Sequence, residues 1–242
     1  MTRPRFFAAA AWALLATSFL ATPVQAAPAF KNISAIAAAQ NGNADPTVTL
    51  PAHAANDVLL LSTIVRSGTA TVATPTGWTQ IGTPTVRAGT ATYQFFWIRA
   101  AGTNSETNPV INRTGTTGDV YAAVVNYSGA TTTGDPWEVK GAVATGTADP
   151  ATCTAITTLS ADALVVAALA GEDNNNGSIT TTGTDPAAYT EHYLESGTGA
   201  DGLITFSEAV RTTAGATGNV SVNFNSGNPV GWGCMVLALT PQ

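Results

Sequence analysis

The feature that most constrains this fold is a series of short apolar runs separated by turn residues. Beyond residue 27 the runs are rich in Val, Ile, Thr, Tyr and Phe, the separators are Gly, Asn, Asp, Ser and Pro, and no helical repeat occurs. This pattern is typical of strands joined by turns. We expect strands at 58–66, 92–99, 120–127, 163–170, 203–211, 220–224 and 233–239, and weaker ones at 48–50, 137–143 and 152–159. The missing crossover helices exclude a parallel α/β fold.

Two of these runs are apolar on both faces of the expected strand. Residues 59–61 (Leu-Leu-Leu) and 164–166 (Leu-Val-Val) show no alternation with polar residues. A strand with one solvent-exposed face alternates between apolar and polar residues. These strands do not alternate, so both of their faces must be covered. We expect a second sheet on one side and loops or a partner on the other. The sequence therefore predicts an all-β protein, an antiparallel β-sandwich or jelly roll.

The chain also resembles itself, which predicts an internal two-fold duplication with halves at about 30–129 and 137–240. Short segments recur in the same order at similar offsets: 44–46 at 148–150, 57–60 at 162–165, 97–99 at 209–211, 111–112 at 222–223 and 121–123 at 232–234. Either one fused sandwich or two tandem small ones would fit this repeat. Strands that are apolar on both faces favour the fused sandwich.

The N-terminus has the features of a secretory signal peptide. Arg3 and Arg5 precede an apolar run at 6–20, and small residues end at Ala26, after which we expect cleavage. The run is shorter than the roughly 20 residues that a membrane span needs, and no second run is long enough. We therefore expect residues 27–242 to form one β-sandwich domain that is secreted, periplasmic or held at the cell surface, without a membrane span.

The charge balance limits the partners. The chain has 9 Lys+Arg against 15 Asp+Glu, a formal net charge of −6, and only 10% charged residues. Non-specific nucleic-acid binding needs a cationic surplus to release counterions, so we expect no nucleic-acid partner. A charged fraction far below the roughly 25% of ordinary domains also excludes a charged coiled coil.

Cys153 and Cys234 are the only cysteines. An even number in an exported chain favours a disulfide, with two buried thiols as the alternative. Both lie in expected strands, near the beginning and the end of the second half. The bond would therefore join the first strand of that half to its last.

An aromatic stripe is the candidate ligand-binding surface. Tyr93, Phe95, Trp97 and Arg99 alternate along one expected strand and so share a face. Such a stripe could stack on a polysaccharide or fill the core between two sheets. The core is the preferred interpretation, because aromatic side chains dominate core burial. Trp78 is expected to begin a strand and close one end of the core.

Calcium is the metal that the loops could hold. Residues 172–177 are acidic and amide-rich, and Glu172, Asp173 and Asn175 are the candidate ligands. The loop lacks the full order of an EF-hand because residue 177 is Gly, and a polar turn is the alternative. Zinc and copper need clustered His, Cys or carboxylate ligands, which this sequence lacks.

No catalytic motif stands out. There is no G-x-S-x-G elbow. The two histidines, His53 in an expected turn and His192 on an expected strand, have no catalytic spacing around them and are interpreted as structural. A glycosidase would need a pair of carboxylates. Four glutamates could supply one: Glu138, Glu191, Glu195 and Glu208.

An ordered set of motifs resembles a known kind of module. The motifs are Asp-Val-Leu-Leu-Leu at 57–61, Pro-Thr-Gly-Trp-Thr at 75–79, Phe-Trp-Ile-Arg at 96–99 and Tyr-Ser-Gly at 127–129, and a second half opens with Asp-Ala-Leu-Val at 162–165. The set resembles a β-sandwich module of bacterial secreted or surface proteins and phage structural proteins, over nearly all of residues 30–240. Phe96 stands where the pattern has Tyr. The resemblance implies a jelly-roll sandwich and no catalytic residues; the signal peptide favours an exported protein over a virion component.

Three functions follow, in order of preference. The first is a non-catalytic extracellular protein with a structural, adhesive or matrix role. The second is a carbohydrate-binding module, and the third is a secreted hydrolase such as a glycosidase. Apolar edge strands could also support self-association by strand addition.

Overall fold

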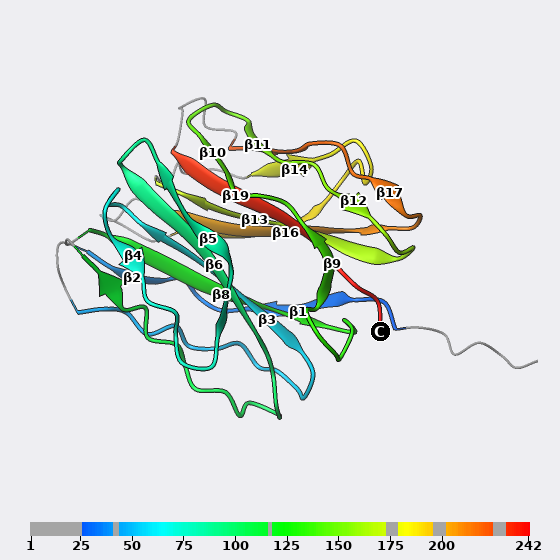
Figure 1. The fold of residues 1–242 in the computed structure, drawn as a ribbon, viewed down its shortest axis with the longest axis horizontal. Coiled ribbons are helices and arrows are strands. Elements are labelled where there is room, and N and C mark those ends of the chain that lie inside the picture. Colours follow the sequence, from blue (N-terminus) through cyan, green and yellow to red (C-terminus); the bar gives the residue numbers. More distant parts are fainter. Residues whose placement is uncertain (1–25, 41–43, 116–117, 173–178, 196–201, 225–230) are drawn as a thin grey trace, which may run out of the picture.

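The computed structural model describes residues 26–40, 44–115, 118–172, 179–195, 202–224 and 231–242 (Figure 1). Within these ranges the chain forms strands and no helix, in antiparallel sheets. The predicted all-β sandwich is therefore confirmed. Residues 1–25, which carry nearly all of the predicted signal peptide, lie outside the described residues.

Two large sheets form the body of the molecule. The first has the order β1 (Ala29–Ile33), β8 (Val120–Ser128), β3 (Val58–Val65), β6 (Ala91–Arg99), β5 (Thr79–Arg87), with β2 (Ala37–Ala39) also on β8. The second has the order β10 (Ala144–Gly146), β19 (Trp232–Leu239), β13 (Ala163–Gly171), β16 (Leu203–Arg211), β15 (Thr190–Glu195), with β9 (Trp137–Lys140) also on β19.

Smaller sheets flank them. They consist of β11 (Ala151–Cys153), β18 (Val220–Asn223) and β14 (Thr180–Thr182); of β12 (Thr157–Thr158) and β17 (Gly215–Ala216); and of β4 (Thr71–Val72) and β7 (Arg113–Thr114).

The two large sheets stack face to face (Figure 1). β3 lies against β13, β8 against β16, and β5 against β10. The inner faces share one core, whose fully buried members include Ile64, Phe95, Tyr127, Ile204 and Phe206. Burial of so many large apolar side chains, at roughly 1.5–3 kcal/mol each, is the main stabilisation of the sandwich.

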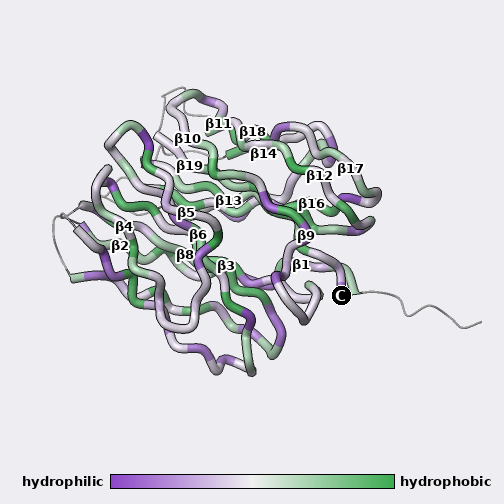
Figure 2. The backbone as a smooth tube through the Cα atoms, in the orientation of Figure 1, coloured by the Kyte–Doolittle hydropathy of each residue, from purple (hydrophilic) through white to green (hydrophobic). Residues whose placement is uncertain are grey.

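Each outer face is covered by the connections of its own half. On the first sheet, Leu59, Leu61 and Phe96 pack against Trp78 and Ile111 from the loops. On the second sheet, the outward residues of β13 and β19 pack against β11, β18 and their loops. Figure 2 shows apolar stretches along the central strands of both sheets. The expectation that strands apolar on both faces need two covers is confirmed, and here the outer cover is the chain's own loops.

The strongest expected strands correspond to β3, β6, β8, β13, β16, β18 and β19. The weaker expectations were partly wrong. Residues 48–50 form no strand, β9 ends at Lys140, and the run at 152–159 is split between β11 and β12. These segments lie at sheet edges and in the outer cover. There a short strand can pair irregularly with its neighbour without leaving a gap in the core.

The two large sheets share one strand order. In each, the first strand of the half (β1, or β9 and β10) lies beside its last strand (β8 or β19), followed by β3, β6 and β5 or by β13, β16 and β15. The matched residues, however, do not superpose in their orientation. Leu59 faces outward from the first sheet, whereas its match Leu164 faces the shared core. A shift of one residue turns a side chain to the other face of a strand, so the duplication is not confirmed.

Candidate functional site

A cleft lies on the outer side of the first sheet, where the loop before β5 meets the loop after β6. Its volume is about 560 Å³. The residues that line it are Thr74, Pro75, Thr76, Gly77, Trp78, Ile98, Glu106, Thr107, Asn108, Pro109, Val110 and Asn112. It therefore contains the Pro-Thr-Gly-Trp segment that the sequence singled out.

A tight turn explains the local sequence of this segment. The Trp78 N–H donates to the Pro75 carbonyl at 3.0 Å, and Gly77 has a φ of +83°. A type II turn needs a positive φ at its third residue, which glycine adopts without strain. The turn delivers Trp78 onto the outer face of the sheet, where only 6% of it remains exposed. Trp78 stands one residue before β5, not in it as predicted, and it seals the outer core of the first sheet at the floor of the cleft.

The cleft combines an apolar floor with a polar rim. Pro75 and Trp78 are buried, Ile98 is half-buried, and Val110 is 42% exposed. The rim consists of exposed side chains, namely those of Thr74, Thr76, Thr107, Asn108 and Asn112.

Most polar side-chain groups of this rim are available for hydrogen bonds to a ligand. Asn108 uses only its carbonyl oxygen, which accepts the Leu50 N–H at 3.0 Å. The hydroxyls of the three threonines and the amide of Asn112 make no hydrogen bond within the described part of the chain. The rim therefore presents both donors and acceptors to a ligand.

One charged side chain, Glu106, lines the cleft and is held from behind by His53. His53 Nε2 lies 2.5 Å from Glu106 Oε2, within ion-pair distance, and both side chains are almost fully buried. The other ring nitrogen, Nδ1, lies 2.8 Å from the Pro51 carbonyl oxygen. Since a carbonyl oxygen only accepts, Nδ1 is the ring nitrogen that donates here, to Pro51.

The second oxygen of Glu106 is also occupied. Oε1 accepts the Ala101 N–H at 2.5 Å and the Ser105 hydroxyl at 3.0 Å. Burial alone would raise the pKa of Glu106, but these hydrogen bonds and the charge of His53 outweigh it and hold the pKa below its ordinary value. Glu106 is therefore an ionised anchor for the loop: Oε1 accepts two hydrogen bonds, and Oε2 lies within ion-pair distance of His53.

The aromatic stripe faces the core between the sheets. Tyr93 is fully buried and Phe95 is 2% exposed, and Trp97 packs at the edge of the same core against Trp137, with ring centroids 5.3 Å apart. Arg99 donates to the carbonyls of Thr131 and Gly134. The rings of Tyr93 and Phe95 offer no face to solvent, so a sugar could stack on them only if the sheets moved apart.

Glu172, the described member of the proposed calcium set, is paired with a cation of the protein itself. Its two oxygens accept Arg87 Nε and Nη2 at 2.6 Å each, and Oε1 also accepts the Tyr93 hydroxyl at 2.9 Å. Burial would raise the pKa of Glu172, but these hydrogen bonds and the guanidinium charge lower it. Asp173 and Asn175 lie outside the described residues, so calcium stays a prediction that the contacts of Glu172 do not favour.

His192 and the described candidate acids make contacts within the protein. His192 Nε2 lies 2.8 Å from Glu208 Oε1, and its ring stacks on Phe30 at 3.6 Å, which joins the two sheets at β15 and β1. Glu138 accepts the N–H groups of Leu159 and Ser160, and Glu191 accepts that of Thr181. The side chain of Glu195 is not among those described.

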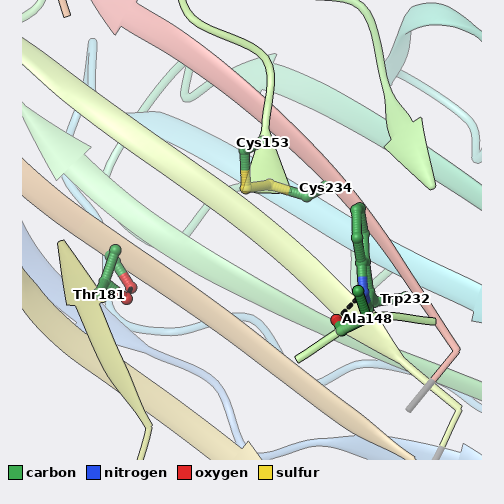
Figure 3. The surroundings of a disulfide bond; sticks show 6 residues. Ala148, Cys153, Thr181, Trp232 and Cys234 are labelled. Carbon is green, nitrogen blue, oxygen red and sulfur yellow. Dashed lines mark hydrogen bonds between the residues drawn. A yellow bond between two sulfur atoms is a disulfide. The ribbon is translucent and has the colours of Figure 1, made fainter. Parts of the chain in front are cut away.

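The predicted disulfide between Cys153 and Cys234 is present (Figure 3). The expected placement of Cys153 was wrong, however, because β11 is not the first strand of its half. β11 belongs to the outer cover, and the bond fastens this cover to β19 of the second sheet. On the same strand, Trp232 Nε1 donates to the Ala148 carbonyl at 2.8 Å. Both contacts hold the segment around β11 onto the sheet.

Among the described residues, no three His, Cys, Asp or Glu side chains gather as a metal site would require. In the same part of the chain, no helix has the length and apolarity to cross a membrane.

Sequence reasoning missed the partners of the histidines and of Glu172. Glu106 was not among the candidate residues, because it meets His53 only through the folding of two loops. The Pro-Thr-Gly-Trp turn was the one signal that pointed to the cleft. No family model, curated protein or solved structure matches this chain, so the resemblance to a secreted or phage β-sandwich module stays a prediction.

Proposed function

We propose that this chain is an exported, non-catalytic β-sandwich protein with an adhesive or structural role outside the cytoplasm. Its N-terminal residues have the charge and apolarity of a signal peptide. The Cys153–Cys234 disulfide supports the same compartment, since disulfides persist in oxidising surroundings.

The observation that carries the adhesive role is the open cleft on a closed scaffold. Both faces of both sheets are covered by the chain itself, and ion pairs such as Arg87–Glu172 join the sheets. Such a scaffold holds its loops in place without a partner. The rim around Trp78 is where this scaffold offers hydroxyl and amide groups to a ligand. Glu106, held by the Ala101 N–H and the Ser105 hydroxyl, favours positioning over proton transfer.

Two measurements test this function. The full chain is expressed in a bacterial host beside a chain that lacks residues 2–26, and the mature N-terminus is sequenced. We expect export with cleavage after Ala26 for the full chain alone. Particles coated with residues 27–242 are then passed over bacterial cells and their surface matrix under flow.

The coated particles should be retained more strongly than particles coated with albumin. A full chain that stays in the cytoplasm with an intact N-terminus would contradict export. Retention no greater than that of albumin would contradict the adhesive role.

A further inference from the structure

We propose that the cleft at Trp78 binds a neutral saccharide. This inference rests on the proposed adhesive function and names the ligand class of its site. It places that site on the outer side of the first sheet, away from the buried stripe of Tyr93, Phe95 and Trp97.

The floor of the cleft suits the apolar face of a sugar ring. Pro75, Trp78, Ile98 and Val110 contribute apolar surface at its base. A pyranose ring carries C–H groups on its faces and hydroxyls around its rim, so it packs on such a floor while its edge stays polar. The volume of about 560 Å³ lies in the range of small-molecule sites, which combine apolar walls with a few placed polar groups.

The rim suits the hydroxyls of the same ring. A threonine hydroxyl both donates and accepts, and so does a primary amide through its two ends. Thr74, Thr76 and Thr107 supply three such hydroxyls, and Asn112 supplies a whole amide. The free –NH₂ of Asn108 adds a donor, since only its oxygen is engaged. Sugar hydroxyls also donate and accept, so this set needs no charge on the ligand.

The charges around the cleft favour a neutral ligand over an acidic one. Of the described side chains that line it, none is Lys or Arg, and Glu106 is the single charged group. His53 Nε2 lies behind that carboxylate, 2.5 Å from Oε2, and His53 is not part of the cleft lining. An anionic sugar would meet the carboxylate without a cation to pair with, which costs binding free energy.

The test compares neutral and acidic saccharides on the folded mature chain. Residues 27–242 are screened against oligosaccharides of glucose, mannose, galactose and N-acetylglucosamine, and against oligogalacturonates of the same lengths. Affinities of the hits are measured by calorimetry. We expect binding of at least one neutral series, with the oligogalacturonate of equal length bound more weakly.

A double variant locates the site. Thr107→Ala with Asn112→Ala removes two exposed rim groups that make no side-chain hydrogen bond in the described chain, so the fold should persist, as circular dichroism and Tm will check. Loss of two neutral hydrogen bonds should weaken binding about 5- to 100-fold. The matched control, Thr152→Ala with Thr157→Ala, changes exposed threonines of the cover on the second sheet and should bind like the wild type.

Three results would overturn the inference: no neutral saccharide binds, the oligogalacturonate binds more tightly, or the rim variant binds like the wild type. Its failure is distinct from failure of the adhesive function. Coated particles that hold to cells while no saccharide binds would leave the adhesive role and reject this ligand. Saccharide binding by a chain that is not exported would support this ligand and reject the proposed function outside the cytoplasm.

Discussion

Arg87 of β5 donates two hydrogen bonds of 2.6 Å to the carboxylate of Glu172, which follows β13. The two residues come from different sheets, so the pair ties the sheets together at one end of the sandwich. Their side chains keep 14% and 15% exposure, and Tyr93 and Thr90 add hydrogen bonds to the same carboxylate. The geometry is therefore that of a largely desolvated, bidentate pair, which depends on both partners being present.

Removing either member of this pair should destabilise the fold strongly. We expect Arg87→Ala and Glu172→Gln each to lower the free energy of unfolding by about 2–4 kcal/mol, because each leaves a partner unpaired. The double variant should cost much less than the sum of the two, as measured by urea unfolding. Asp119→Asn is the control: its pair with Arg66 is 4.0 Å long and more exposed, so its cost should stay within about 1 kcal/mol. Additive costs for Arg87 and Glu172 would contradict the coupling.

Stability should fall at acid pH, and Glu106 should contribute to the fall. The pKa of Glu106 is held below its ordinary value in the folded chain, so between the two pKa values the unfolded chain binds more protons. The stabilisation is therefore complete above the unfolded pKa, near 4.3, and is lost as pH falls through the lower folded pKa. We expect the unfolding free energy of Glu106→Gln to depend less on pH from about 5 downward than that of the wild type. Parallel curves would contradict this.

The disulfide should stabilise the cover of the second sheet. Cys153→Ser with Cys234→Ser should lower the free energy of unfolding by about 2–5 kcal/mol, because the bond restricts the unfolded chain. Reduction of the wild type should have a similar effect and should leave the double variant unchanged. An unfolding midpoint of the double variant equal to that of the oxidised wild type would refute the stabilising role.

Gly233 should tolerate no side chain, because Tyr93 lies directly against it. A Cβ at Gly233 would stand 2.2 Å from Cγ of the Tyr93 ring across the inter-sheet core. We expect Gly233→Ala to cost roughly 1–3 kcal/mol or more through overpacking, seen as a lower Tm. Gly141→Ala, whose Cβ would meet its nearest atoms at 3.4 Å, should cost less. Equal costs at the two positions would show that the sheets can separate.

Local interactions made much of the architecture predictable. The runs at 59–61 and 164–166 are apolar at consecutive positions, and a strand of that kind is stable only when both faces are covered. The motif at 75–79 was visible too, although the turn within it, with a φ of +83° at Gly77, was not predicted. The hydrophobic period of a strand and the residue preferences of a turn depend on a few neighbouring residues. They can therefore be interpreted before the tertiary structure is known.

The placement of side chains between distant segments could not be predicted in the same way. The alternation of Tyr93, Phe95 and Trp97 shows that they share a face and leaves open which face it is. The partners of His53, Arg87 and His192 come from other strands or loops, and many carboxylates could have met them. The repeat match was also misleading, since an offset of 105 sets Leu59 beside Leu164 although they point to opposite faces.

The sequence by itself thus determined that this chain builds strands and covers both faces of its sheets. Only the tertiary structure decided that the aromatic stripe fills the core, that Glu106 lies between His53 and the cleft, and that Glu172 serves Arg87. The physical reason is range: strand period and turn geometry are set by neighbouring residues, whereas burial and charge pairing depend on how the two sheets and their loops pack together.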